Sequence, residues 1–183
     1  MYKPALVVCL AALAFAPMQP AYAEIGKQST EPGAKKVDSE TKNFVKNARV
    51  GGTFEIETSK LALEKTQNAD IRSFAERMVT DHTNASEKLE QIVSGEAIKV
   101  DEPTSADKLD KKHQAMLDKL RKADGAQFDR LYVQMQQDAH NEAVTLFSKY
   151  AKGGDNAALK SFAQETLPTL QDHKKHVAGM NVS

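Results

Sequence analysis

The chain has 183 residues, and its 25 Lys and Arg balance 25 Asp and Glu. It contains no basic block and no basic stripe interleaved with aromatic residues, so we do not expect nucleic acid as a partner. After residue 23 there is no apolar run of membrane-spanning length, so we expect no transmembrane segment in the mature chain.

Residues 1–23 have the organisation of a cleavable signal peptide. Lys3 supplies a basic start, an apolar run covers residues 5–16, and residues 21–23 (Ala-Tyr-Ala) supply small residues for a signal peptidase. The apolar run is too short to remain as a membrane anchor. We therefore expect an exported protein. The only cysteine, Cys9, would leave with the signal peptide, so chemistry in the mature chain must rest on histidine and carboxylate.

A polar segment with Pro32-Gly33 covers residues 24–38, and we expect it to be a flexible leader. Helical periodicity dominates from residue 39 to residue 180, so we expect one all-α domain there. Within the domain, Asn68 suits a helix N-cap, and Asp155 follows Gly153-Gly154 as the expected cap of the last helix. The predicted helices cover residues 39–66, 69–95, 105–123, 126–152 and 156–179.

Four of the predicted helices are long and the third is short. The first two and the last two are joined by tight links, so each pair should form an antiparallel hairpin. Gly51-Gly52 in the first helix should let a neighbouring helix approach closely. A long connection that holds the short helix joins the hairpins. If it returns along the bundle, the chain is a ferritin-like four-helix bundle with a shorter extra helix in the crossover. A simple up-down array that includes the short helix is the alternative.

Polar side chains on the inner stripes are the candidate metal ligands. Glu55, His82, His140 and His173 each come from a different long helix, and histidine with carboxylate suits zinc, iron or manganese. Counted from the turns, the first three lie at similar heights. His173 is about six residues too far along, or roughly 9 Å. Glu165 lies nearer the right height but at the flank of its stripe.

Other sequence features limit the chemistry. Ferritin-type di-iron sites use Glu-x-x-His repeats, but Val79, Gln137 and Leu170 precede the three histidines at that spacing. A phosphate-binding loop, a nucleophile elbow and a His-Glu-x-x-His pair are also absent from the sequence. We therefore favour a non-enzymatic protein. The alternative to a metal site is a structural or interaction protein of the envelope, in which the histidines, with Asp81 and Asp138, only fix helix register.

Several motifs together resemble a bacterial domain-of-unknown-function family of envelope proteins in the ferritin-like superfamily. The resemblance covers about residues 40–179 and implies a helical bundle in the periplasm or at the outer membrane, where an envelope protein would be the partner. Many members are labelled outer membrane proteins, and no activity or oligomeric state comes with the family. The motifs are Gly51-Gly52-x-Phe54-Glu55, Asn68-Ala-Asp-Ile71-Arg72-x-Phe74-Ala75-x-x-Met78-Val79-x-Asp81-His82, Phe128-Asp129-x-x-Tyr132, His140 and Leu167-Pro168-x-Leu170-x-x-His173.

Overall fold

The computed structural model describes residues 38–100 and 109–182. Its helices are α1 (Ser39–Lys65), α2 (Ala69–Gly95), α3 (Lys111–Arg121), α4 (Gly125–Gly153) and α5 (Ala157–Ala178). The four long helices are confirmed to within one residue at each end. The expected signal peptide at residues 1–23 lies outside the described residues, and so does all but the last residue of the expected leader. None of the described helices is both long and apolar enough to cross a membrane.

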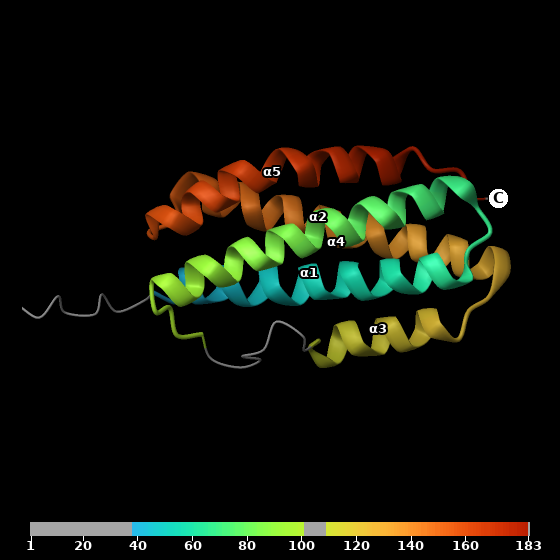
Figure 1. The fold of residues 1–183 in the computed structure, drawn as a ribbon, viewed down its shortest axis with the longest axis horizontal. Helices are drawn as coiled ribbons and strands as arrows, with labels where there is room; N and C mark the ends of the chain where they lie inside the picture. Colours follow the sequence, from blue (N-terminus) through green and yellow to red (C-terminus); the bar gives the residue numbers. More distant parts are fainter. Residues whose placement is uncertain (1–37, 101–108, 183) are drawn as a thin grey trace, which may run out of the picture. The chain divides into compact units, whose positions relative to one another are not determined.

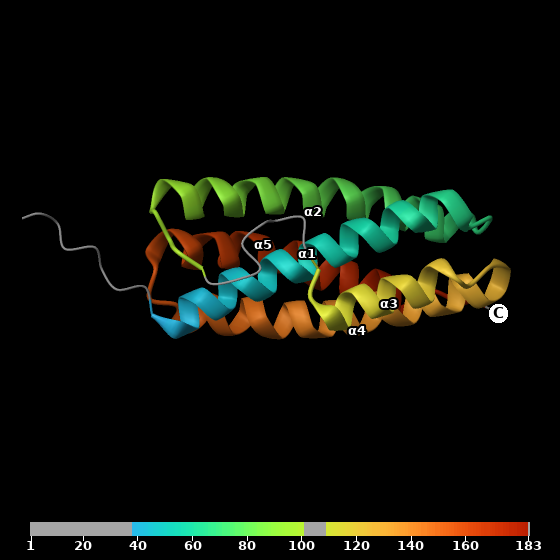
Figure 2. The same ribbon diagram turned by 90° about the horizontal axis from the view of Figure 1, so that it is seen from below.

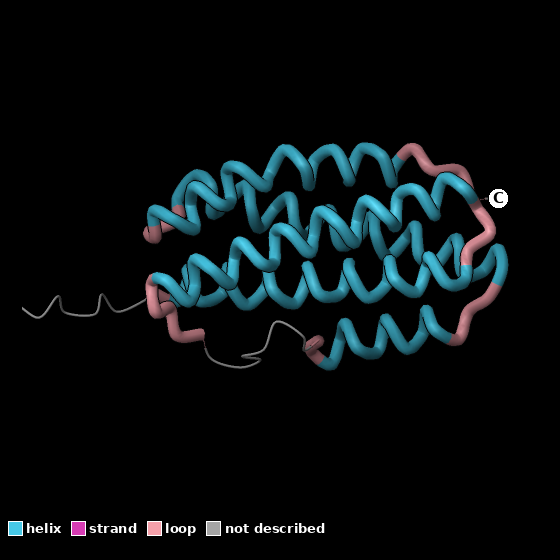
Figure 3. Tube along the Cα trace, in the orientation of Figure 1, coloured by secondary structure: helices cyan, strands magenta, loops and turns pink. Residues whose placement is uncertain are grey.

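The helices form a bundle with one long crossover. α1 pairs with α2, and α4 pairs with α5, while α1 also packs on α4 and α2 on α5. Figure 1 shows α3 returning along the bundle, so that α2 and α4 run in the same direction on opposite corners. The helical trace in Figure 3 shows the same connectivity. The fold is therefore all-α with ferritin-like connectivity, and α3 is the shorter extra helix of the crossover.

Side-chain caps explain where most of the helices begin. The Asn68 carboxamide oxygen accepts hydrogen bonds from Asp70 N (2.9 Å) and Ile71 N (3.2 Å), as the sequence predicts. The expected cap at Asp155 is wrong, because Asn156 accepts from Leu159 N (2.9 Å) instead. Both residues are good cap formers, but Asn156 directly precedes the first helical residue, Ala157, so its side chain occupies the N-cap position.

The third helix is shorter than predicted. It begins at Lys111, after Asp110 caps it by accepting from His113 N (2.9 Å). The prediction started this helix at residue 105, and residues 105–108 lie outside the described part of the chain. α3 packs on α1 and α4, and Figure 2 shows it lying over one half of the face that these two helices form.

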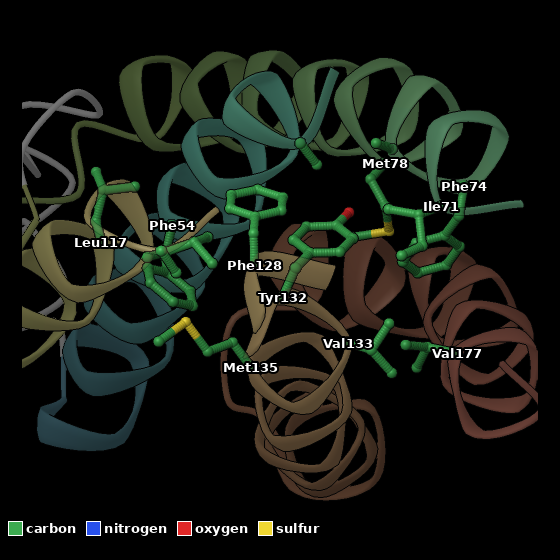
Figure 4. Close-up of a cluster of buried hydrophobic side chains, with 14 residues drawn as sticks. Phe54, Ile71, Phe74, Met78, Leu117, Phe128, Tyr132, Val133, Met135 and Val177 are labelled. Atoms are coloured by element: carbon green, nitrogen blue, oxygen red, sulfur yellow. The ribbon is translucent and has the colours of Figure 1, made fainter. Parts of the chain in front are cut away.

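Two apolar clusters make up the core. One contains Phe74, Phe128 and Tyr132 (Figure 4), and the other contains Phe44 and Phe147. Along α2, α4 and α5, the residues of one cluster give way to those of the other, and a histidine stands between them on each helix. A polar layer therefore separates the two clusters inside the bundle.

The glycine pair of α1 serves two different purposes. A Cβ at Gly52 would lie 3.2 Å from Ser86 Oγ, so this position allows α1 and α2 to approach closely, as the sequence predicts. A Cβ at Gly51 would have no neighbour within 4 Å. Gly51 instead borders a cavity, which is described below.

Candidate metal centre

Three buried histidines meet in the polar layer. His82 of α2, His140 of α4 and His173 of α5 each offer a ring nitrogen, and these atoms lie within 4.8 Å of one another. The ring centroids are 5.4–5.7 Å apart, and each residue is at most 5% exposed. The structure thus brings together all three histidines that the sequence singled out. Among the described residues, this is the group whose spacing would suit a metal ion.

The height of His173 differs from the expectation. His173 stands 16 positions after the start of α5 and His140 stands 13 before the end of α4, so the offset is three positions and not the expected six. By the same number of positions, His82 stands farther from the link between α1 and α2 than Glu55 does. Side chains lean toward the N-terminus of their own helix. In antiparallel helices these opposite leans compensate for an offset of about 4.5 Å between the backbones of the paired residues. Counting residues from the turns therefore gives the wrong height for the His173 side chain.

Hydrogen bonds to the protein fix the proton position on two of the rings. His140 Nδ1–H donates to the backbone carbonyl of Gln136 (2.8 Å), and His173 Nε2–H donates to Asp81 Oδ2 (2.8 Å). The other nitrogen of each ring, Nε2 of His140 and Nδ1 of His173, is buried and has no hydrogen-bond partner. Each of these atoms therefore carries a free lone pair, which is the form of imidazole that binds a metal.

Glu55 lies behind two of the rings. Its Oε2 is 3.2 Å from His82 Nδ1, and its Oε1 is 3.3 Å from His140 Nδ1. The carboxyl group is 2% exposed. It contacts the Nδ1 atoms of the two rings, whereas the nitrogens without hydrogen-bond partners are their Nε2 atoms. His82 Nε2 is the third buried ring nitrogen without a partner. The structure thus places Glu55 beside the histidines rather than among the three closest ligand atoms.

Burial controls the charge of these groups in the metal-free protein. Desolvation lowers the pKa of His82 well below its usual range, and repulsion from His140 and His173 adds to the effect. Desolvation also lowers the pKa of His140 to about 4 and, more weakly, that of His173, where Asp81 acts in the opposite direction. Burial raises the pKa of Glu55 to about 8. At neutral pH the histidines are therefore uncharged, as metal ligands must be.

Sequence reasoning undervalued two neighbours of the cluster. Asp81 was considered only as a register-fixing residue, yet it orients His173. Gln136 was not singled out, but its carbonyl orients His140 and its side chain donates to Thr58 Oγ1 (2.8 Å). The sequence does contain a signal for Gln136: it stands four residues before His140, where a helix places its carbonyl within reach of the histidine ring. Glu165, considered for its height, is exposed and pairs with Lys88.

The fold and the site together define a ferritin-like helical bundle with a buried histidine cluster. The family model described as "Domain of unknown function (DUF4142)" matches residues 26–180, so the chain belongs to this family. The resemblance stated from the sequence motifs is thereby confirmed at the level of a domain-of-unknown-function family.

Comparison with solved structures supports the fold. The chain is similar to a DUF305 fragment from Deinococcus radiodurans, with a TM-score of 0.67 and 15% sequence identity. The match covers 78% of this chain and 95% of the fragment. At that identity the likeness shows the fold alone. No curated protein matches the chain.

Proposed function

We propose that this protein binds one divalent transition-metal ion between α2, α4 and α5, with His82, His140 and His173 as ligands. One observation carries the proposal: each of the three histidines offers a ring nitrogen within 4.8 Å of those of the other two, and each ring has one buried nitrogen without a hydrogen-bond partner. Three histidines around one ion, with a further position for water or another ligand, is an arrangement that zinc adopts in proteins.

The energetics of burial favour this interpretation over a purely structural role. A buried polar atom without a partner costs about 1–3 kcal/mol, and native proteins contain few of them. Here three such atoms lie in one cluster, on three different helices. If the histidines served only to fix helix register, their second nitrogens would be expected to have partners within the protein. A bound cation would satisfy all three lone pairs at once.

The ligand atoms favour zinc or ferrous iron over manganese. All three are imidazole nitrogens, whereas manganese prefers carboxylate, carbonyl and water oxygens. Glu55 and Asp81 would act behind the ligands, each facing the other nitrogen of a ligating ring. Carboxylates in this position fix ring orientation and raise the basicity of the ligand. A cation in the cluster would also favour the ionised form of Glu55.

The decisive experiment is elemental analysis of the purified protein, followed by titration of chelator-treated protein with zinc, ferrous iron and manganese. We expect close to one ion per chain and a rise in melting temperature of roughly 5–10 °C at saturating zinc. The double variant His140→Ala, His173→Ala should contain no bound ion and should show no rise in melting temperature with zinc. The matched control is His176→Ala, which removes an exposed histidine from the same helix as His173 and should change neither.

The competing structural role predicts a different result. In that case the purified protein contains no metal, added metal leaves the melting temperature unchanged, and the double variant is merely less stable. A water molecule held by the histidines would give the same result, since it contributes no metal. Either outcome would refute the metal site and leave an envelope protein whose buried polar groups serve the fold.

A further inference from the structure

A cavity of about 650 Å³ lies beside the histidine cluster and is partly open to solvent. Its size falls within the range of about 300–1,000 Å³ that small-molecule sites occupy. Its lining comes from the four long helices and from His113 at the beginning of α3. α3 covers only one half of the α1–α4 face (Figure 2), and the exposed lining residues belong to α1 and α4.

The walls of the cavity are apolar. Phe54 of α1, Leu89 of α2, Phe147 of α4 and Phe162 of α5 line it, and each of them is buried. Gly51 borders the same space, and a Cβ placed there would meet nothing within 4 Å. A backbone position without a side chain thus leaves room on the α1 side of the cavity.

Two polar groups line the inner part of the cavity. Glu55 and His82 both contribute to its lining, and both are buried. Glu55 Oε1 and His82 Nε2 have no hydrogen-bond partner. An apolar pocket with a few convergent polar groups is the usual composition of a small-molecule site, where the polar groups orient the ligand.

Apart from Glu55 and His82, the ionisable side chains that line the cavity already have partners. A ligand with a net charge would therefore find no free counter-ion among the charged lining residues outside the cluster, and burying its charge would be unfavourable. The pairs are Lys149 with Glu40 (3.0 Å), Glu142 with Lys112 (3.1 Å) and His113 with Asp110 (2.8 Å).

We infer that the cavity binds an uncharged, mostly apolar organic molecule and directs its single hydrogen-bonding group toward Glu55, since His82 Nε2 is taken up by the proposed metal ion. One part of this inference rests on the proposed function: with a metal bound, the polar end of the ligand would lie next to the ion. The apolar part of the site does not depend on the metal. A long-chain alcohol has the required chemistry: an apolar body and one neutral group that donates and accepts hydrogen bonds.

Fluorescence titration with N-phenyl-1-naphthylamine, an uncharged dye that brightens in apolar surroundings, tests the inference. We expect saturable binding to wild type, and displacement by 1-decanol at lower concentration than by decanoate or decylamine. Gly51→Leu, which adds a side chain inside the cavity, should weaken dye binding about tenfold or more. Gly153→Leu adds the same side chain at an exposed position that likewise has no Cβ neighbour within 4 Å, and should bind as wild type does.

The position of the polar end has its own test. Glu55→Leu should weaken binding of decanol more than binding of the dye, because a hydroxyl both donates to and accepts from that carboxyl group, whereas the diarylamine N–H of the dye only donates. The inference is overturned if the dye does not saturate, if a charged amphiphile displaces it best, or if the two glycine variants behave alike. An unchanged preference for decanol in Glu55→Leu would overturn the proposed orientation.

Metal binding and cavity binding can fail separately. The titrations are therefore made on metal-loaded wild type, chelator-treated wild type and the His140→Ala, His173→Ala variant. Dye binding in protein that never takes up metal would refute the proposed function and support the cavity. Stoichiometric metal without saturable dye binding would refute the cavity and support the metal site.

Discussion

At the scale of single residues, the arrangement of the site depends on the partners of the histidines. His173 is held by a charged group, since its Nε2–H donates to the Asp81 carboxylate. His140 is held by a neutral group, the backbone carbonyl of Gln136. A carboxylate partner raises the basicity of the opposite nitrogen more than a carbonyl does. Asp81 is therefore the neighbour whose replacement should affect metal affinity most clearly without removing a ligand.

We predict that Asp81→Asn lowers metal affinity about 10-fold, and Asp81→Ala up to about 100-fold. The asparagine keeps an oxygen that accepts from His173 but loses the negative charge, which explains the smaller effect. Competition titration against a chromophoric chelator measures both. The control is Asp138→Asn, because Asp138 is an exposed aspartate two residues before His140. This variant should bind metal with the affinity of wild type. Equal affinity of Asp81→Ala and wild type would show that Asp81 does not support a metal ligand.

At the scale of elements, the sequence predicted the long helices because their end signals are local. Asn68 and the Gly153-Gly154 pair mark helix ends within a few residues of chain, and the apolar stripes have helical spacing. The height of His173 could not be read in this way, because it depends on the opposite lean of side chains in paired helices. The role of Asp81 depends on the packing of α2 against α5, which a single sequence does not specify. Gln136, by contrast, lies on the same helix as His140, four residues before it.

The two glycines of α1 should respond differently to the same substitution. Gly51→Ala should stabilise the protein by about 0.5–1 kcal/mol, because alanine favours a helix and its Cβ meets no neighbour. Gly52→Ala should gain less or destabilise, since its Cβ would lie 3.2 Å from Ser86 Oγ. Chemical denaturation of both variants in chelator measures the difference. If both variants shifted the midpoint equally, α1 and α2 would not be closely packed at Gly52.

At the scale of the whole molecule, the polar layer lies between two apolar clusters rather than at an end of the bundle. Phe74 belongs to one cluster, and its ring lies 6.3 Å from that of His140 and 6.1 Å from that of His173. Apolar packing on both sides buries the histidines, and desolvation favours their uncharged form. This packing involves no ion, so we expect the bundle to fold without metal and the proposed ion to bind to the folded protein.

The compartment of the folded protein depends on residues 1–23. Their basic start, apolar run and small-residue end indicate a signal peptide, which would direct the protein out of the cytoplasm. We predict that the full chain, expressed in a bacterium, is recovered from the periplasm or outer membrane with Glu24 as its first residue. Cell fractionation and intact-mass measurement test this prediction.

Blocking the cleavage site provides the variant that tests the mechanism of export. Ala21 and Ala23 stand where signal peptidase requires small residues, so Ala21→Leu with Ala23→Leu should accumulate the uncut precursor at the inner membrane. Ala34→Leu, beyond the predicted cleavage site, should be processed normally and is the matched control. Recovery of the wild-type chain from the cytoplasm with residues 1–23 still attached would refute export.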